Sequence, residues 1–486
     1  MPQKLTGFHS WLRPAIRLAA PLALGMLVTG CSVFDSINHT LFGTRSGPAP
    51  GQQGYVKGFL GWVVADEPRA ALVGKEVLSG GGNAADAAVA VGLSLAVTLP
   101  SRAGLGGGGA CIAYASDRHL LPRGYPEAIT FVSPPVRSVG GGDRPAAVPM
   151  LARGMFMLHA RYGKLPIEQL ITKAEDLARR GVPASTALTR DLALVAGPLF
   201  GDPEARAVFS LGGAPLAEGQ RLLQPQLSAT LAELRVSGIG DLYQGVLARR
   251  IAQVSPSAGV PIGLQDLWFA LPSLSSPVIV PVGDDQVAFP PTEGGVGAAA
   301  ALIALNSQPA DFQSAWARSL GAAATWRAGG ANLDQVLHGN VAAPATTPLY
   351  PASTTFATLD PDGNAVVCAL TMNNLFGTGR MVPGFGFLAA ASPATVNPPL
   401  LAPGLAWSND RHAFHAEAGG SGQAGAALAA AVALSNSLRS GYPMTSLVPD
   451  PGRANVISCG RYLPGSDSSC GAAADPREAG LAAGGQ

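Results

Sequence analysis

A run of hydroxyl residues, Ser353-Thr354-Thr355, could supply this chain with a nucleophile. It follows a segment rich in Pro, Ala and Thr, residues 342–351, and it opens an apolar run. If the chain is cut immediately before Ser353, the new α-amine can accept the proton of that hydroxyl, and the oxygen can then attack an amide. The same residues also suit an ordinary strand start, so at this level both interpretations stand.

Two strands joined by a turn would position that hydroxyl. Residues 353–359 are rich in strand formers, and Asp362-Gly363 before a second apolar run is a strong hairpin signal. The second strand leads to Thr371-Met372-Asn373, and strand alternation places the Thr371 and Asn373 side chains on one face. Both residues would also fit as ordinary polar residues at a strand edge.

Periodicity predicts helices around this hairpin. Apolar residues recur at helical spacing over 65–80, and 84–97 is an Ala-rich apolar run. Further elements are expected as helices over 167–180, 227–235 and 424–438, as a strand, a Pro-Pro turn and a helix over 285–306, and as strands over 353–391. Residues 308–350 are weakly patterned and are expected to be exposed. Strands bracketed by helices suit a layered α/β fold.

These motifs resemble those of the gamma-glutamyltransferase family of N-terminal-nucleophile hydrolases. The family's small subunit begins with a nucleophilic Thr upstream of an Asp-x-Asp-Gly-Asn turn, and the matching turn here is 360–364. An ungapped count back from that turn places Ser353 at the nucleophile position, whereas a slip of one residue would make it Thr354. Further matching segments follow in the family's order at 80–90, 101–109, 147–149, 159–166, 241–245, 290–295 and 475–477.

The resemblance implies a four-layer αββα sandwich, which is an α/β fold. It also implies a self-processing amidohydrolase or acyltransferase that cleaves γ-glutamyl amides such as glutathione through an acyl-enzyme, without a cofactor. The chain would divide before the nucleophile into a large-subunit region, 57–352, and a small-subunit region, 353–486. A small amide or peptide would be its substrate, and the two fragments of the chain would be partners.

The resemblance also assigns roles to individual residues. Thr371 would hydrogen-bond the nucleophile, and Asn373 would help to bind substrate. Gly419-Gly420-Ser421 resembles the family's Gly-Gly-Ser, in which the backbone amides of the glycines form the oxyanion hole, and the serine would contact substrate. Two N–H donors directed at a developing oxyanion stabilise the transition state strongly. A plain glycine loop before the 424–438 helix is the alternative for this segment.

Three segments depart from the family's pattern, and all three concern substrate binding. Val132 stands where the family has an Arg that binds the substrate carboxylate, and Val cannot replace that bidentate contact. Residues 389–393 replace the segment with the amine-binding Asp, and 399–403 replace the one with two substrate-binding Ser. Three hypotheses follow: an enzyme for γ-glutamyl compounds, the same fold acting on another amide with a less polar acyl group, or a non-catalytic lipoprotein.

The first residues resemble a bacterial lipoprotein signal. Basic residues precede an apolar run, 18–27, and 27–31 fits a lipobox in which Cys31 would carry the lipid. An uncleaved membrane helix is the alternative, but the apolar run is short and contains a proline. Residues 32–56 are expected to be a flexible tether. Ser32 after the Cys gives no inner-membrane retention signal, so we expect a periplasmic protein anchored by lipid to the outer membrane.

The composition suits a folded, turn-rich chain. Of the 486 residues 47% are hydrophobic and 13% charged, with 62 Gly and 41 Pro, which argues against disorder. The net charge of +1 gives no indication of a nucleic-acid partner. The glycine run at 104–109 precedes an apolar strand rather than a helix, which argues against a dinucleotide-binding turn.

The cysteines fall into two pairs beside Cys31. Cys459 and Cys470 lie in a polar segment and are close enough in sequence for a local disulfide, which the sequence leaves open. Cys111 and Cys368 lie in apolar strands and are predicted to be buried thiols. The seven His are scattered without a metal-ligand pattern, so no metal site is predicted.

Overall fold

The computed structural model describes residues 58–116, 124–137, 142–339 and 352–485. All of them belong to the second of two units into which the chain divides, Pro48–Gln486. The predicted signal segment with Cys31 and the tether at 32–56 lie outside the described residues. Among the helices in the described ranges, none is long and apolar enough to span a bilayer.

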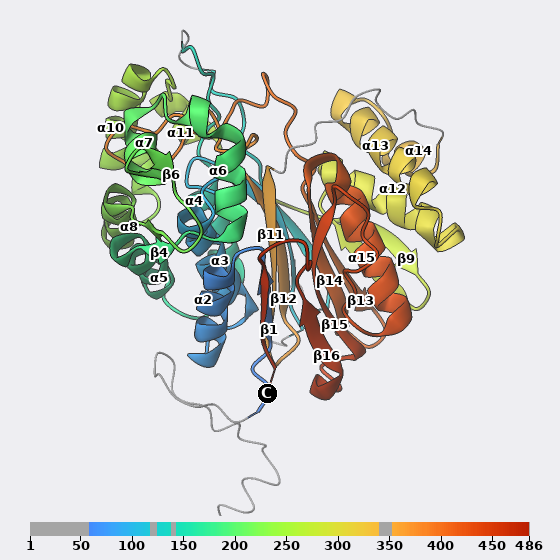
Figure 1. The fold of residues 1–486 in the computed structure, drawn as a ribbon. Coiled ribbons are helices and arrows are strands. Elements are labelled where there is room, and N and C mark those ends of the chain that lie inside the picture. Colours follow the sequence, from blue (N-terminus) through green and yellow to red (C-terminus); the bar gives the residue numbers. More distant parts are fainter. Residues whose placement is uncertain (1–57, 117–123, 138–141, 340–351, 486) are drawn as a thin grey trace, which may run out of the picture. The chain divides into compact units, whose positions relative to one another are not determined.

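Two β-sheets lie between layers of helices (Figure 1). Every strand pair in them is antiparallel. The first sheet has the order β17 (Leu481–Gly484), β1 (Trp62–Ala65), β11 (Ser353–Leu359), β12 (Ala365–Thr371), β2 (Gly108–Tyr114), β3 (Glu127–Phe131), β8 (Ser273–Ser275). The second has the order β16 (Cys470–Ala473), β15 (Arg453–Leu463), β14 (Ala413–Ser421), β13 (Ala402–Ser408), β10 (Asp285–Phe289), β9 (Val278–Val282).

The sheets pack face to face through an apolar layer. Val64 and Ala357 from the first sheet and Leu405, Trp407 and Ile457 from the second belong to one buried cluster. These residues occupy alternate positions of their strands, so the opposite strand faces are free to pack against helices. The predicted hairpin, β11 and β12, therefore lies in the middle of the structure, between a helical layer and the second sheet.

Helices on the outer face of the first sheet include the predicted Ala-rich one. α3 (Ala84–Thr98) is buried along its whole length and packs against β11 and β12. It begins with a capping box, in which Asn83 and Asp86 each accept a hydrogen bond from the other's backbone N–H. The remaining helices of this part are α2 (Pro68–Ser79), α4 (Leu151–Tyr162), α5 (Ile167–Arg180), α6 (Thr186–Leu199), α7 (Pro203–Phe209), α8 (Pro225–Ser237), α9 (Asp241–Gln244), α10 (Val246–Val254) and α11 (Leu264–Phe269).

Helices on the outer face of the second sheet complete the fourth layer. α12 (Glu293–Ser307) and α15 (Ala426–Ser440) pack against its strands, and both are rich in small apolar residues that allow close approach. In the described part of the weakly patterned segment 308–350, most residues are exposed or half-buried, which confirms that expectation, but the sequence predicted no helix there. α13 (Phe312–Ala328) and α14 (Leu333–His338) form there, because α13 buries one narrow face of small residues against α12. The order helix, sheet, sheet, helix confirms the predicted αββα architecture.

The predicted strands over 353–391 are only half present. β11 and β12 form as expected, but 372–391 contains isolated bridges and no longer strand. Four glycines with positive φ interrupt that segment, namely Gly377, Gly379, Gly384 and Gly386. Such backbone turns cannot continue a strand.

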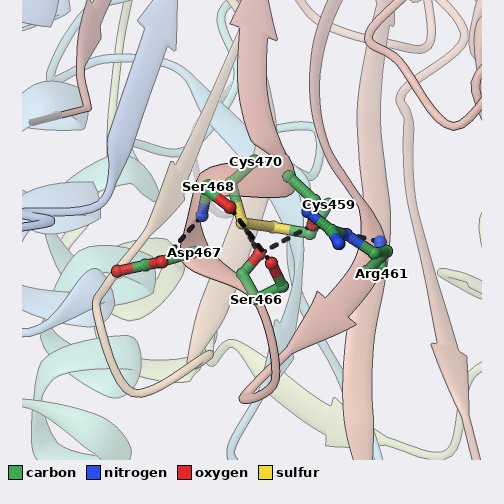
Figure 2. The surroundings of a disulfide bond; sticks show 7 residues. Cys459, Arg461, Ser466, Asp467, Ser468 and Cys470 are labelled. Carbon is green, nitrogen blue, oxygen red and sulfur yellow. Dashed lines mark hydrogen bonds between the residues drawn. A yellow bond between two sulfur atoms is a disulfide. The ribbon is translucent and has the colours of Figure 1, made fainter.

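Two disulfides connect neighbouring strands. Cys459 and Cys470 are register partners on β15 and β16, and their disulfide closes the turn seen in Figure 2. The prediction of buried thiols at Cys111 and Cys368 is wrong, because these residues are register partners on β2 and β12 and form a disulfide with Cα atoms 4.1 Å apart. Direct cross-strand neighbours place their Cβ atoms close together, and a separation of 257 residues hid that pairing in the sequence.

Candidate active site

The predicted nucleophile, Ser353, is the first residue of β11. It is fully buried, and among the described residues its Oγ has no hydrogen-bond partner. Its register partner on β12 is Thr371, so the two side chains share a sheet face. A buried hydroxyl without a partner costs free energy, and a catalytic role is one reason why native proteins retain such groups, which suits the role predicted for Ser353.

The Thr371 hydroxyl contacts the peptide bond that precedes Ser353. Its Oγ1 donates to the carbonyl oxygen of Ala352 at 2.9 Å, and it accepts a hydrogen bond from the Asn373 N–H at 2.8 Å. The prediction was a hydrogen bond to the nucleophile itself. The structure instead directs the hydroxyl at the carbonyl that a self-cleaving Ser353 would attack.

Asn373 lies beyond the end of β12. Strand alternation therefore does not apply to it, and the residue adopts a left-handed φ of 62°. Its Nδ2 donates to the Ala391 carbonyl at 2.9 Å, whereas its buried Oδ1 has no partner among the described residues. Asn373 thus lies beside Thr371 because of a bend after β12 and not because of strand alternation. Its contact with substrate stays a prediction.

Thr354, the alternative nucleophile, points to the opposite face of β11. Its Oγ1 donates to the Oδ2 atom of Asp66 at 2.9 Å. This hydroxyl is therefore engaged, whereas that of Ser353 is not. The geometry favours Ser353 of the two residues.

Gly419 and Gly420 lie at the end of β14, in the second sheet, and not in the loop that was the alternative interpretation. A Cβ on Gly419 would lie 2.6 Å from the Thr355 Cβ, and one on Gly420 would lie 2.0 Å from the Ala426 carbonyl oxygen of α15. Both positions therefore require glycine for packing alone. Both residues also pair with β13 and β15, and the oxyanion role of their N–H groups stays a prediction.

Ser421 follows these glycines and is buried. Its Oγ has no partner within the part of the chain that the structure describes. Its register partner on β15 is Arg453, which forms an ion pair with Asp450 at 2.7 Å. An unengaged hydroxyl next to the glycines is compatible with the predicted substrate contact, which stays a prediction.

Sequence reasoning missed a buried carboxylate next to the nucleophile strand. Asp66 follows β1, and its Oδ2 accepts hydrogen bonds from the Thr354 Oγ1 and from the Thr355 N–H, the latter at 3.0 Å. Its Oδ1 accepts a hydrogen bond of 2.6 Å from Asn455 on β15. Burial raises the pKa of Asp66, and the charge of Arg102 opposes that shift. Neither Asp66 nor Asn455 belongs to a recognisable motif, so only the fold identifies them.

A second buried carboxyl, Glu417, lies two residues before Gly419 on the same face of β14. It is fully buried, and neither carboxyl oxygen has a partner among the described residues. Its strand neighbours, Leu405 and Ile457, belong to the apolar layer between the sheets. Burial raises the pKa of Glu417 well above its usual range. The sequence analysis did not single out this residue.

Two positions that depart from the family's substrate-binding pattern have apolar neighbours in the structure. Val132 and Leu401, from two of the divergent segments, pack with Ala110 and Ala369 in a small buried cluster. Ala369 lies two residues before Thr371, so it is the diagonal neighbour of Ser353, at a typical distance of about 7–8 Å. The described ranges contain no group of three His, Cys, Asp or Glu that could hold a metal ion.

Known relatives match this chain over much of its length. It is 27% identical to the "Glutathione hydrolase proenzyme" of Escherichia coli (strain K12) over 391 residues, which cover 68% of this chain and 66% of that protein. It is 33% identical to the "Acylase ACY 1 proenzyme" of Pseudomonas sp. (strain SE83) over 227 residues, which cover 43% of this chain and 41% of that protein. The chain thus spans less than two thirds of the length of these relatives.

A solved structure and a family model complete the comparison. The crystal structure of cephalosporin acylase from Bacillus halodurans resembles this fold with a TM-score of 0.71 at 19% identity, covering 91% of this chain and 99% of that one. A likeness at that identity concerns the fold alone. The family model for gamma-glutamyltranspeptidase matches residues 70–328, which is more than half of the 486 residues. The chain therefore belongs to the gamma-glutamyltranspeptidase family.

Proposed function

We propose that this chain is a self-processing amidohydrolase or acyltransferase with Ser353 as its nucleophile. One observation carries the proposal. The unengaged Ser353 hydroxyl and the Thr371 hydroxyl lie at the same peptide bond, and the second already donates to the carbonyl oxygen of that bond. A nucleophile and an oxyanion donor at one amide are the parts that acyl transfer requires.

Self-cleavage proceeds as an acyl shift from nitrogen to oxygen. The Ser353 Oγ attacks the Ala352 carbonyl carbon, and its proton is transferred to the departing Ser353 nitrogen. The Thr371 hydroxyl stabilises the negative charge that develops on the carbonyl oxygen. The C–N bond breaks and leaves an ester between Ala352 and Ser353 with a free α-amine. Water then hydrolyses the ester to give the Ala352 carboxylate and the free Ser353 hydroxyl.

The processed chain then acts on other amides. The new α-amine takes the proton of the Ser353 hydroxyl, and Oγ attacks the substrate carbonyl. The N–H groups of Gly419 and Gly420 are the proposed oxyanion donors. The leaving amine takes the proton, and an acyl-Ser353 ester remains. Water or an acceptor amine resolves that ester, which gives hydrolysis or transfer.

Two substrate classes are proposed. The names of the relatives support γ-glutamyl amides such as glutathione on one side and an acylase activity on the other. The apolar cluster of Val132, Leu401, Ala110 and Ala369 favours the second class, amides with a less polar acyl group. A charged carboxylate or ammonium placed against these side chains would lose hydration without gaining a partner. Comparing hydrolysis of γ-glutamyl-p-nitroanilide with that of hexanoyl-p-nitroanilide distinguishes the two classes.

We also propose that the chain is anchored by lipid at Cys31 in the bacterial periplasm, at the outer membrane. The lipobox at 27–31 supports this location. The two disulfides suit an oxidising compartment. Membrane fractionation of cells that express wild type and Cys31→Ala tests it, since the variant should move from the membrane to the soluble fraction. Wild-type protein in the soluble fraction would contradict the anchor.

Denaturing electrophoresis with intact mass measurement tests the function. Wild type should yield two fragments, of which the smaller begins at Ser353, and Ser353→Ala should remain a single chain. Thr354→Ala should still be cut before Ser353. A small fragment that begins at Thr354 would transfer the nucleophile role to that residue. An uncut wild-type chain would refute the enzyme and leave the non-catalytic lipoprotein as the better account.

A further inference from the structure

The two halves of the proposed site lie on different sheets. Ser353 begins β11 of the first sheet, whereas Gly419 and Gly420 lie just before the end of β14 of the second. Within the described residues, no strand of one sheet pairs with a strand of the other. The distance from the nucleophile to the glycines therefore depends on how the sheets are held together at this edge.

A set of buried hydrogen bonds joins the sheets immediately beside both halves. The Thr355 Oγ1 on β11 donates to the Gly419 carbonyl oxygen at 3.1 Å. The Asn455 Nδ2 on β15 lies 3.0 Å from both the carbonyl oxygen and the Oγ1 of Thr355. Since Gly419 has no side chain, Thr355 can approach the β14 backbone directly.

Asp66, the residue after β1, completes this set of hydrogen bonds. Its Oδ1 accepts a hydrogen bond of 2.6 Å from the Asn455 Nδ2, and its Oδ2 accepts one of 3.0 Å from the Thr355 N–H. Asp66, Thr355 and Asn455 are each at most 1% exposed. Burial raises the pKa of Asp66, and the nearby positive charge of Arg102 partly offsets that shift. Within a buried site, such hydrogen bonds are strong and directional.

We propose that Asp66, Thr355 and Asn455 form an inter-sheet clamp that sets the distance between Ser353 and the glycines of β14. They are positioning residues, because they contact the backbones of both halves without reaching the reacting atoms. The inference rests on the proposed function. A displacement of the order of 1 Å between reacting groups can cost about 100-fold in rate. Loss of the clamp should therefore slow acyl transfer without weakening substrate binding.

Two substitutions at Thr355 separate hydrogen bonding from packing. Thr355→Val keeps the shape and removes the hydroxyl, whereas Thr355→Ser keeps the hydroxyl and removes a methyl group. Each variant is synthesised in a cell-free system, and its self-cleavage is followed by gel during a chase. Thr355→Val should cleave roughly 10-fold more slowly or worse, and Thr355→Ser should stay close to wild type. If Thr355→Ser is the slower variant, Thr355 acts by packing and the clamp is refuted.

Two further variants complete the test. Asn455→Ala removes the clamp from the second sheet and should also slow cleavage, and it decides the question if Thr355→Val does not fold. Glu67→Gln is the matched control, since Glu67 is the buried neighbour of Asp66 but caps α2 through the Ala70 N–H. Among processed variants, kcat for hexanoyl-p-nitroanilide should fall while KM is retained. Wild-type rates in Thr355→Val and Asn455→Ala would overturn the clamp, whereas an uncut wild type would refute the proposed function itself.

Discussion

Replacement of Thr371 by Val removes a hydroxyl that donates to the carbonyl oxygen of the Ala352–Ser353 peptide bond. The Thr371 Oγ1 donates to the Ala352 carbonyl oxygen at 2.9 Å. Loss of one donor to a developing oxyanion costs about 100- to 1,000-fold in rate, or about 2.7–4 kcal/mol of barrier. We therefore expect self-cleavage of Thr371→Val to slow by that factor, and Thr371→Ser to retain most of the rate.

The same substitution should also lower stability, and the two effects can be separated. The Asn373 N–H donates to Thr371 Oγ1, so Val leaves this buried donor without an acceptor, at a cost of about 1–3 kcal/mol. Unfolding in urea measures that cost in a Ser353→Ala background, where the chain stays uncut. The cleavage rate is followed separately, by gel, in the chain with Ser353 present.

Three outcomes bear on this reasoning. A large loss of rate with a modest loss of stability supports the role of Thr371 at the scissile carbonyl. A Thr371→Val chain that cleaves as fast as wild type would refute it. Equal loss of rate in Thr371→Ser and Thr371→Val would also refute it, because Ser retains the donor.

Further predictions concern the buried carboxyl, the disulfide and the apolar cluster. The buried Glu417 should make stability fall as pH rises above the usual glutamate pKa, by at most about 1.4 kcal/mol per pH unit from this one group, because the unfolded chain releases its proton while the folded chain retains it. Burial raises the pKa of other carboxyls too, Asp66 among them, so Glu417→Gln should show a shallower slope than wild type rather than none in urea titrations between pH 5 and 8, and parallel curves would contradict the assignment. The double substitution Cys111→Ala/Cys368→Ala should cost about 2–5 kcal/mol of unfolding free energy, measured by calorimetry or urea, and an unchanged value would show that the thiols were not bonded. Leu401→Ala should lower kcat/KM for hexanoyl-p-nitroanilide by about 10-fold or more relative to acetyl-p-nitroanilide, and an unchanged ratio would place the acyl chain elsewhere.

Local patterns were sufficient for the elements that carry the nucleophile. The hairpin of β11 and β12 could be predicted, since strand formers flank an Asp-Gly turn and both strands are short-range features. The Ala-rich helices α3 and α15 could be predicted from local composition for the same reason. The weakly patterned segment that forms α13 and α14 could not, because these helices are stabilised by packing against α12 rather than by a strong apolar stripe of their own.

Sequence by itself determined the order of motifs and the family they resemble, and it predicted Ser353, or Thr354 after a slip of one residue, as the start of the small-subunit region. It also identified the loss of the substrate clamps, because the absence of an Arg at position 132 needs no coordinates. Only the tertiary structure decided what surrounds Ser353. Asp66 and Asn455 reach Thr355, two residues along β11, from segments far away in sequence, and Cys111 and Cys368 bond across 257 residues. Such contacts depend on the order of strands in each sheet and on the way the two sheets face one another. Local propensity contains no information on either.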